Sequence, residues 1–123
     1  MNSTQTRSFL EDVFGRWQAT KDMKIWLDAL DEELVWTVVG SSPTSGTYRS
    51  KQAYTAGVVD KLKQWVQEEP VPTLKQLVVE GDRAAAWLQT AAIAKDGKPF
   101  VIEYCWMMKL SNNLVTEGIG FYA

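Results

Sequence analysis

Hydrophobic residues recur three to four positions apart in three segments of the first 66 residues, which predicts three helices. The first ends near Thr20 and begins at Ser8, which has capping-box spacing, or earlier, around Ser3 or Thr4. Asp22 can cap the second helix and Ser50 the third. The apolar positions of the three helices are, in order, Phe9, Leu10, Val13, Phe14 and Trp17; Met23, Trp26, Leu27 and Leu30; and Tyr54, Val58, Leu62, Trp65 and Val66.

Six further segments have the composition of β-strands. Turns are predicted at Gly81-Asp82, Asp96-Gly97 and Ser111–Asn113, so the last four segments form a meander. Gly118 and Gly120 alternate in the final strand, which indicates a bend or the close approach of another backbone. The segments are Leu34–Val39 after the acidic turn Asp31–Glu33, the short Thr47–Arg49, Thr73–Glu80, Arg83–Ala94, Pro99–Leu110, and a last one that ends at Tyr122.

The two longest strands, Arg83–Ala94 and Pro99–Leu110, are apolar on both of their alternating faces. An ordinary antiparallel meander leaves one face in water, so a sheet with two apolar faces must be covered twice. The three helices can cover one face. We expect a second copy of the chain to cover the other, which predicts an α+β domain that forms a homodimer through its outer sheet face.

Composition and charge narrow the function classes. The chain of 123 residues is expected to form one domain, 1–123, and its scattered Lys and Arg residues with a net charge of −2 argue against nucleic-acid binding. No apolar run suits a membrane span or a signal peptide, and the single Cys105 excludes an internal disulfide, so a cytoplasmic protein is expected. Without histidine, and with one thiol, neither a metal nor a cofactor is expected, and catalysis would depend on carboxylates, tyrosine, Lys, Arg or water.

Two stretches carry a resemblance to a known family. They are VWTVVGSSPTSGTYRSKQAY, residues Val35–Tyr54, and EYCWMMKLSNNLVTEG, residues Glu103–Gly118. With the order of the elements, they resemble the SnoaL-like branch of the nuclear transport factor 2-like superfamily. The resemblance implies a cone-shaped α+β barrel, usually dimeric, in which a curved, mostly antiparallel sheet wraps around three helices from the N-terminal half and leaves a pocket at its open end. Members include ketosteroid isomerase, scytalone dehydratase, limonene epoxide hydrolase, polyketide cyclases and non-catalytic binding proteins.

The positions that match the catalytic groups of ketosteroid isomerase mostly carry other residues. That enzyme uses an Asp base opposite a Tyr and a protonated Asp. By resemblance, the base position falls at Thr37, the Tyr position near Val13 or Phe14, and the second acid at Glu103 or Cys105. Only Glu103 in this set can ionise as an acid near neutrality, so the isomerase and cyclase chemistries are not expected in their known form.

Glu103 is the candidate catalytic residue. It lies in a strand that has no other charge before Lys109, and a carboxylate in an apolar pocket would have a raised pKa. The alternative is a carboxylate at the sheet rim or paired with Arg83 or Lys98 across the hairpin. The indoles are expected mostly in the core, although several around a pocket would suit a flat apolar ligand. The predicted ligand contacts are Trp17, Thr37, Tyr48, Trp87 and Glu117.

Two function classes therefore remain. The first is a small-molecule-binding cone with an apolar pocket which, if catalytic, would be a cofactor-free isomerase, dehydratase or hydrolase. In that case Glu103 would carry the proton, and Thr37 and Tyr48 would orient the ligand. The second is a non-catalytic dimeric scaffold or accessory domain whose tryptophans fill its own pocket.

Overall fold

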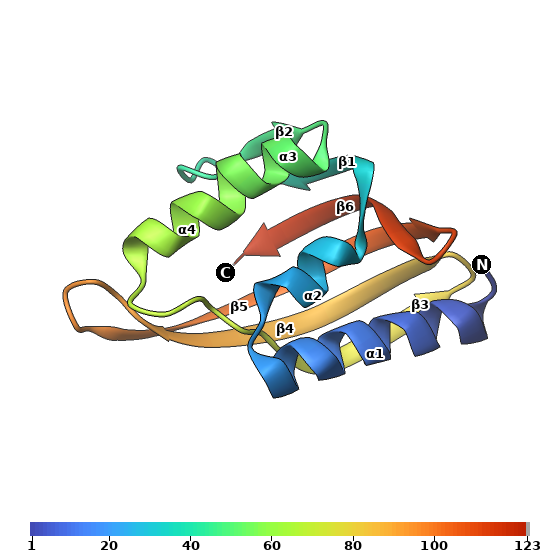
Figure 1. Ribbon diagram of the computed structural model, residues 1–123, viewed down its shortest axis with the longest axis horizontal. Helices are drawn as coiled ribbons and strands as arrows, with labels where there is room; N and C mark the ends of the chain where they lie inside the picture. Colours follow the sequence, from blue (N-terminus) through green and yellow to red (C-terminus); the bar gives the residue numbers. More distant parts are fainter. Residues whose placement is uncertain (123) are drawn as a thin grey trace.

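The computed structural model of the chain describes residues 1–122, in which helices lie on one side of a curved six-stranded sheet (Figure 1). None of the helices in this range is long and apolar enough to cross a membrane. The helices are α1 (Ser3–Thr20), α2 (Met23–Asp28), α3 (Lys51–Tyr54) and α4 (Asp60–Trp65), with the π-helix η1 (Thr55–Val59) between the last two. The strands are β1 (Leu30–Val38), β2 (Gly46–Tyr48), β3 (Thr73–Glu80), β4 (Arg83–Ile93), β5 (Pro99–Ser111) and β6 (Leu114–Tyr122).

The strands are ordered β2-β1-β6-β5-β4-β3 across the sheet. All neighbouring pairs are antiparallel except β1 and β6, which run in the same direction. Helix α1 packs along β3 and β4, whereas α3 contacts β1 and β2 at the other edge of the sheet. Helix α4 continues the direction of α3 away from that edge (Figure 1). The predicted α+β fold, a curved and mostly antiparallel sheet around helices, is confirmed.

Side-chain caps define the helix starts. Asn2 caps α1: its side chain accepts from the backbone N–H of Gln5, and the Gln5 side chain accepts from that of Asn2, so the earlier of the two predicted starts is correct. The predicted caps Asp22 and Ser50 are also confirmed, because each accepts a backbone N–H of its helix at 2.9 Å. At both junctions between α3, η1 and α4 the backbone stays helical, so residues 51–65 form one rod.

Strand β1 begins earlier than the sequence predicts. Leu30, expected at the end of the second helix, pairs with Val115 of β6, and the next pair is Val35 with Glu117. The predicted acidic turn, Asp31–Glu33, therefore lies within β1, in an irregularity where β1 has more residues than β6. Such a bulge bends the strand and lets the acidic side chains reach water while Leu30 is buried.

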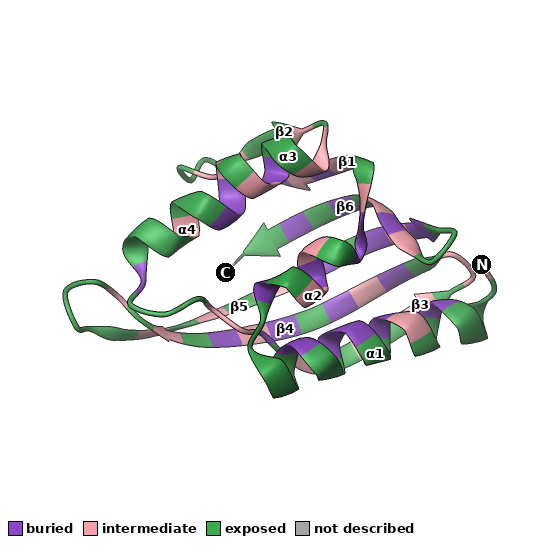
Figure 2. Cartoon of the chain, viewed as in Figure 1, coloured by how far each residue is buried: buried purple, intermediate pink, exposed green. Residues whose placement is uncertain are grey.

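The core lies between the helices and the inner face of the sheet. Along β4 and β5 burial alternates from one residue to the next, as Figure 2 shows for β4. The side of α1 that is buried against this face carries Leu10, Val13, Phe14 and Trp17. Thr6 is also buried, and its hydroxyl donates to the Gly81 carbonyl at 2.6 Å, which ties α1 to the β3–β4 turn.

The outer face of the same strands is apolar and uncovered in the single chain. Trp87 is 44% exposed, Met107 50% and Val101 62%. The two-faced apolar character expected from the sequence is thus present, with the helices on one face only.

The two glycines of β6, Gly118 and Gly120, make room for side chains. Of the two expectations for them, the close approach of another backbone is therefore wrong. A Cβ at Gly118 would overlap the indole of Trp36, and one at Gly120 would lie 3.0 Å from the ring of Tyr122. Trp36 can be fully buried because no side chain stands beneath it on β6.

Candidate ligand-binding cavity

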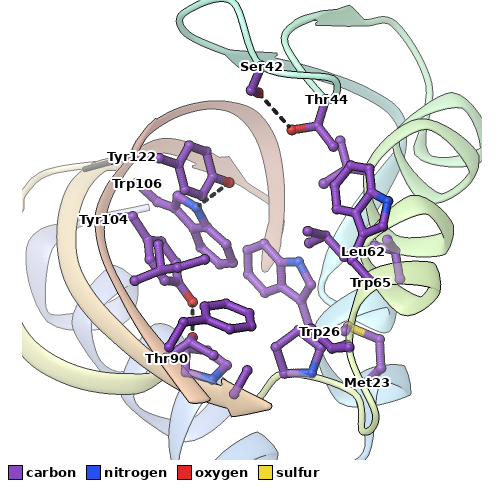
Figure 3. Close-up of a pocket in the computed structure, with 18 of the residues that line it drawn as sticks. Met23, Trp26, Ser42, Thr44, Leu62, Trp65, Thr90, Tyr104, Trp106 and Tyr122 are labelled. Carbon is purple, nitrogen blue, oxygen red and sulfur yellow. Dashed lines mark hydrogen bonds between the residues drawn. The ribbon is translucent and has the colours of Figure 1, made fainter. Parts of the chain in front are cut away.

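A cavity of about 310 Å³ lies between the helical rod and the inner face of β4, β5 and β6. Figure 3 shows Tyr104, Trp106 and Tyr122 on one side of it, with Leu62 and Trp65 opposite. The side chains around it are mostly aromatic and aliphatic. They are Trp17, Met23, Trp26, Ser42, Thr44, Tyr54, Val58, Val59, Leu62, Trp65, Val66, Pro70, Pro72, Thr90, Ala92, Phe100, Ile102, Tyr104, Trp106 and Tyr122.

Three stacked indoles from three different elements form one wall. The ring centroids of Trp17 and Trp26 are 5.7 Å apart with an interplanar angle of 4°, and those of Trp26 and Trp106 are 4.8 Å apart at 23°. Behind them, Trp36 meets Trp106 edge to face at 5.2 Å. Offset-stacked and edge-to-face packing are the preferred aromatic geometries, so these rings hold one another in place.

Hydroxyl groups supply most of the polar chemistry of the cavity. Trp26 Nε1 donates to the Tyr54 hydroxyl at 3.1 Å, and Trp106 Nε1 donates to the Tyr122 hydroxyl at 3.3 Å. The hydroxyls of Thr90 and Tyr104 form a hydrogen bond of 2.6 Å (Figure 3). At the mouth, Ser42 and Thr44 come from the loop that joins β1 to β2.

The cavity is electrostatically neutral. Within residues 1–122, its lining includes no Asp, Glu, Lys, Arg or Cys, and no cluster of three potential metal ligands occurs anywhere in that range. Burial raises the pKa of Tyr54 and of Tyr104 far above the ordinary value. Burial also raises the pKa of Tyr122; that residue is 42% exposed, but its hydroxyl sits against buried Trp106. All three phenols therefore stay protonated at neutral pH.

Comparison with known proteins shows which family has this architecture. The family profile of the SnoaL-like domain matches residues 10–118. The chain belongs to the SnoaL-like domain family. This confirms the resemblance carried by the Val35–Tyr54 and Glu103–Gly118 stretches. A comparison with curated protein sequences found no match.

Solved structures share the fold of this SnoaL-like domain at low sequence identity. An NTF2-like protein from Burkholderia xenovorans LB400 is 19% identical, covers 100% of this chain and 92% of its own, and has a TM-score of 0.72. An NTF2-like protein of unknown function from Burkholderia pseudomallei K96243 is 15% identical over 96% of this chain and 90% of its own, with a TM-score of 0.80. TerC, co-crystallised with polyporic acid, is 9% identical over 96% and 91%, with a TM-score of 0.79.

Glu103 lies outside the cavity of this SnoaL-like domain. It is exposed on the outer face of β5 and accepts a hydrogen bond from Gln89 Nε2 at 3.3 Å, while its neighbours Ile102 and Tyr104 line the cavity. The prediction that Glu103 is a pocket carboxylate is wrong, because side chains alternate along a strand and Glu103 has the outward parity. Cys105 shares that parity and likewise does not line the cavity.

Among the predicted ligand contacts, Trp17 lines the cavity and the other four do not. Thr37 hydrogen-bonds Thr47 at 3.2 Å, and Tyr48 donates to the Thr44 carbonyl at 2.6 Å while its ring packs over Gly57. Trp87 and Glu117 are exposed on the outer face. For Thr37, Trp87 and Glu117 the cause is again strand parity, since the helices cover the other set of positions.

The sequence interpretation missed the three phenols and Thr90. Tyr104 and Trp106 belong to the same alternating set as Phe100 and Ile102, so a choice of inner face would have found them together. Tyr54 was assigned to the apolar stripe of the third helix, which is correct for its ring. Its hydroxyl reaches the cavity beside α2, where it accepts a hydrogen bond from Trp26 Nε1.

Proposed function

We propose that this SnoaL-like domain binds a small, flat, neutral and largely apolar molecule in the cavity between the helical rod and the sheet. The observation that carries the proposal is the wall of stacked indoles in a lining that holds hydroxyls but no charge. An uncharged aromatic and aliphatic lining suits a planar apolar ligand, which can bury most of its surface in the cavity. The volume, about 310 Å³, is at the lower end of the range for small-molecule sites, ~300–1,000 Å³.

The same lining favours binding over the acid–base catalysis that the sequence suggested. A general base that works near neutrality needs a group that is deprotonated there. Glu103 points the other way, and the phenols of Tyr54, Tyr104 and Tyr122 have raised pKa values, so none is available as a base. TerC, a structural relative, was crystallised with polyporic acid, which supports a small-molecule role for a protein with this fold.

A pair of matched fluorescent probes tests the proposal. N-phenyl-1-naphthylamine is neutral, and 8-anilinonaphthalene-1-sulfonate is the same molecule with an anionic group. We expect the neutral probe to bind with enhanced fluorescence, and the anionic probe to bind at least about tenfold more weakly, because the cavity has no cation to compensate a buried sulfonate. Equal affinities, or no binding of either probe, would refute the proposal.

Two substitutions that add the same side-chain volume on opposite faces of β4 locate the bound probe. Ala92 lines the cavity and Ala91, its neighbour on β4, is exposed on the opposite face. Ala92→Phe should fill part of the cavity and abolish binding of the neutral probe. Ala91→Phe adds the same volume outside and should leave the affinity unchanged. If both variants bound like the wild type, the probe would lie elsewhere.

We also propose that a second copy of the chain covers the outer sheet face. Cross-strand pairing aligns two apolar rows there: Ile119, Met107, Ala85 and Val78 in one, and Phe121, Cys105 and Trp87 in the other. A charged row, Glu117, Lys109, Arg83 and Glu80, borders the first, and the polar pair Gln89–Glu103 lies beyond the second. An apolar centre with a polar rim is the usual anatomy of an isologous interface.

Sedimentation velocity at micromolar concentration tests this interface. The wild type should sediment as a dimer. Met107→Glu, in the middle of an apolar row and 50% exposed in the single chain, should yield a folded monomer. Thr73→Glu adds the same charge at the polar edge, opposite Gln89, and should remain dimeric. A monomeric wild type would overturn the proposal.

A further inference from the structure

We propose that the ligand carries a neutral hydrogen-bond acceptor of the carbonyl type, as in a planar aromatic ketone or quinone, and that the hydroxyls of Tyr54 and Tyr122 donate to it. This inference rests on the proposed binding function and specifies the class of ligand. It follows from the direction of the hydrogen bonds around the cavity.

The first step concerns Tyr54. The indole N–H of Trp26 donates to its hydroxyl oxygen at 3.1 Å, and an indole nitrogen can only donate. Tyr54 is therefore the acceptor in this pair and keeps its own O–H. Among residues 1–122 that proton has no acceptor within hydrogen-bonding distance, although the residue is only 3% exposed. Buried polar groups are nearly always satisfied, so an unused donor at a cavity wall indicates a missing partner.

Tyr122, on β6, repeats the arrangement. Trp106 Nε1 donates to its hydroxyl at 3.3 Å, again leaving the phenol proton without an acceptor in the described part of the chain. Both phenols line the cavity, and the two indoles that donate to them, Trp26 and Trp106, are stacked with ring centroids 4.8 Å apart, which brings the two hydroxyls to the same part of the cavity.

The remaining hydroxyl pair, Thr90 and Tyr104, adds a further proton without an acceptor. In the Thr90–Tyr104 hydrogen bond one oxygen accepts, and the residue that accepts retains its own proton. The Tyr104 ring stacks on Tyr122 with centroids 5.3 Å apart, so this pair lies beside the second phenol. The inner lining thus presents three hydroxyl protons that have no acceptor among residues 1–122. A carbonyl oxygen suits it because its two lone pairs accept two hydrogen bonds, and a neutral molecule suits it because no cation lines the cavity.

A matched pair of planar ligands tests the inference. Fluorenone and fluorene have the same ring system, and only fluorenone has a carbonyl. Each would compete with N-phenyl-1-naphthylamine for the wild-type protein. Two hydrogen bonds to the carbonyl should make fluorenone bind roughly tenfold more tightly than fluorene, and should lower its carbonyl stretching frequency in the bound state relative to fluorenone in an apolar solvent.

Tyrosine-to-phenylalanine variants identify the donors. Tyr54→Phe and Tyr122→Phe should each reduce the preference for fluorenone, and the double variant should bind both ligands equally. Fluorene affinity should hardly change, which controls for the integrity of the cavity. Tyr48→Phe is the matched control, because the Tyr48 hydroxyl donates to the Thr44 carbonyl and does not line the cavity.

The outcomes separate the inference from the function on which it rests. If fluorene and fluorenone bound the wild type equally, or if the preference survived in the double variant, the acceptor hypothesis would be overturned while binding in the cavity stood. If neither ligand displaced the probe and the probe itself did not bind, the proposed function would fail. Should the double variant not fold, the infrared shift in the wild type decides, and its absence overturns the inference.

Discussion

Replacing Gly118 with alanine is the most direct test of how the aromatic wall is supported. Gly118 lies on β6 beneath Trp36, which is fully buried. A methyl group built at Gly118 would overlap the Cζ3 and Cε3 atoms of the Trp36 ring and come within 2.9 Å of Cη2. Ordinary carbon contacts are ~3.5–4.0 Å, so the indole or the strand must move.

The expected loss of stability can be estimated from the packing around Trp36. Its ring is held edge to face by Trp26 at 6.0 Å and by Trp106 at 5.2 Å, and it contacts Tyr54 at 5.3 Å, so it cannot swing aside. Overpacking of a tight core costs about 1–3 kcal/mol, and this overlap belongs at the upper end. Alanine regains about 0.5–1 kcal/mol relative to glycine through the unfolded chain. The net loss is therefore about 2 kcal/mol, or a fall in Tm of roughly 8 °C.

Urea unfolding followed by tryptophan fluorescence measures this loss. The control is Gly15→Ala, the same substitution at an exposed position in α1, where a Cβ meets no atom within 4 Å. It should raise the free energy of unfolding by about 0.5–1 kcal/mol, because glycine is a poor helix former. The two variants should thus shift stability in opposite directions without a change in the slope of the denaturant dependence.

A double-mutant cycle shows whether the loss comes from Trp36. Trp36→Phe removes much of the ring that the methyl would meet, so the double variant Trp36→Phe/Gly118→Ala should be more stable than the sum of the single losses by at least about 1 kcal/mol. The reasoning is refuted if Gly118→Ala lowers stability by less than about 0.5 kcal/mol, since a rigid wall cannot absorb the methyl group at that cost.

Two further predictions concern ionisation and capping. Burial raises the folded-state pKa of Tyr54 and Tyr104 above the ordinary value of 10.0, so the unfolded chain loses these protons first as the pH rises. The free energy of unfolding should therefore be unaffected below about pH 10 and fall above it by up to ~1.4 kcal/mol per pH unit for each phenol. Urea unfolding in buffers from roughly pH 9 to pH 11 checks this, and a flat profile would contradict it. Ser50→Ala removes the side-chain acceptor for the Ala53 N–H at the start of α3 and should lower the free energy of unfolding by about 1 kcal/mol. The control Ser8→Ala, at an exposed position inside α1, should be neutral or slightly stabilising. Equal effects of the two variants in thermal melts would show that the cap is unimportant.

Much of the fold follows from local patterns that the sequence displays directly. The caps Asp22 and Ser50 act on backbone N–H groups two or three residues away, so their roles can be predicted without any tertiary contact. The turns at Asp96-Gly97 and Asn112-Asn113 lie between long apolar segments, and apart from the start of β1 the strands begin and end close to the predicted positions. The doubly apolar character of β4 and β5 is likewise a property of alternate residues.

The candidate site, in contrast, depended on information that alternation does not contain. A strand pattern defines two sets of side chains but not which set faces the helices, and so it did not reveal that Glu103 faces outward while Tyr104 lines the cavity. The pairs Trp26–Tyr54 and Trp106–Tyr122 join residues 28 and 16 positions apart, which only the packing of different elements can bring together.

The sequence by itself therefore determined the elements, their order and the presence of two apolar sheet faces, because each of these depends on interactions within a few residues. Tertiary structure alone decided which face of the sheet the helices cover, and this choice gives the cavity its neutral, phenol-lined character. The physical reason is that burial is a property of the assembled layers: the position of α1 and the α3–α4 rod across the sheet selects one parity of each strand as the interior.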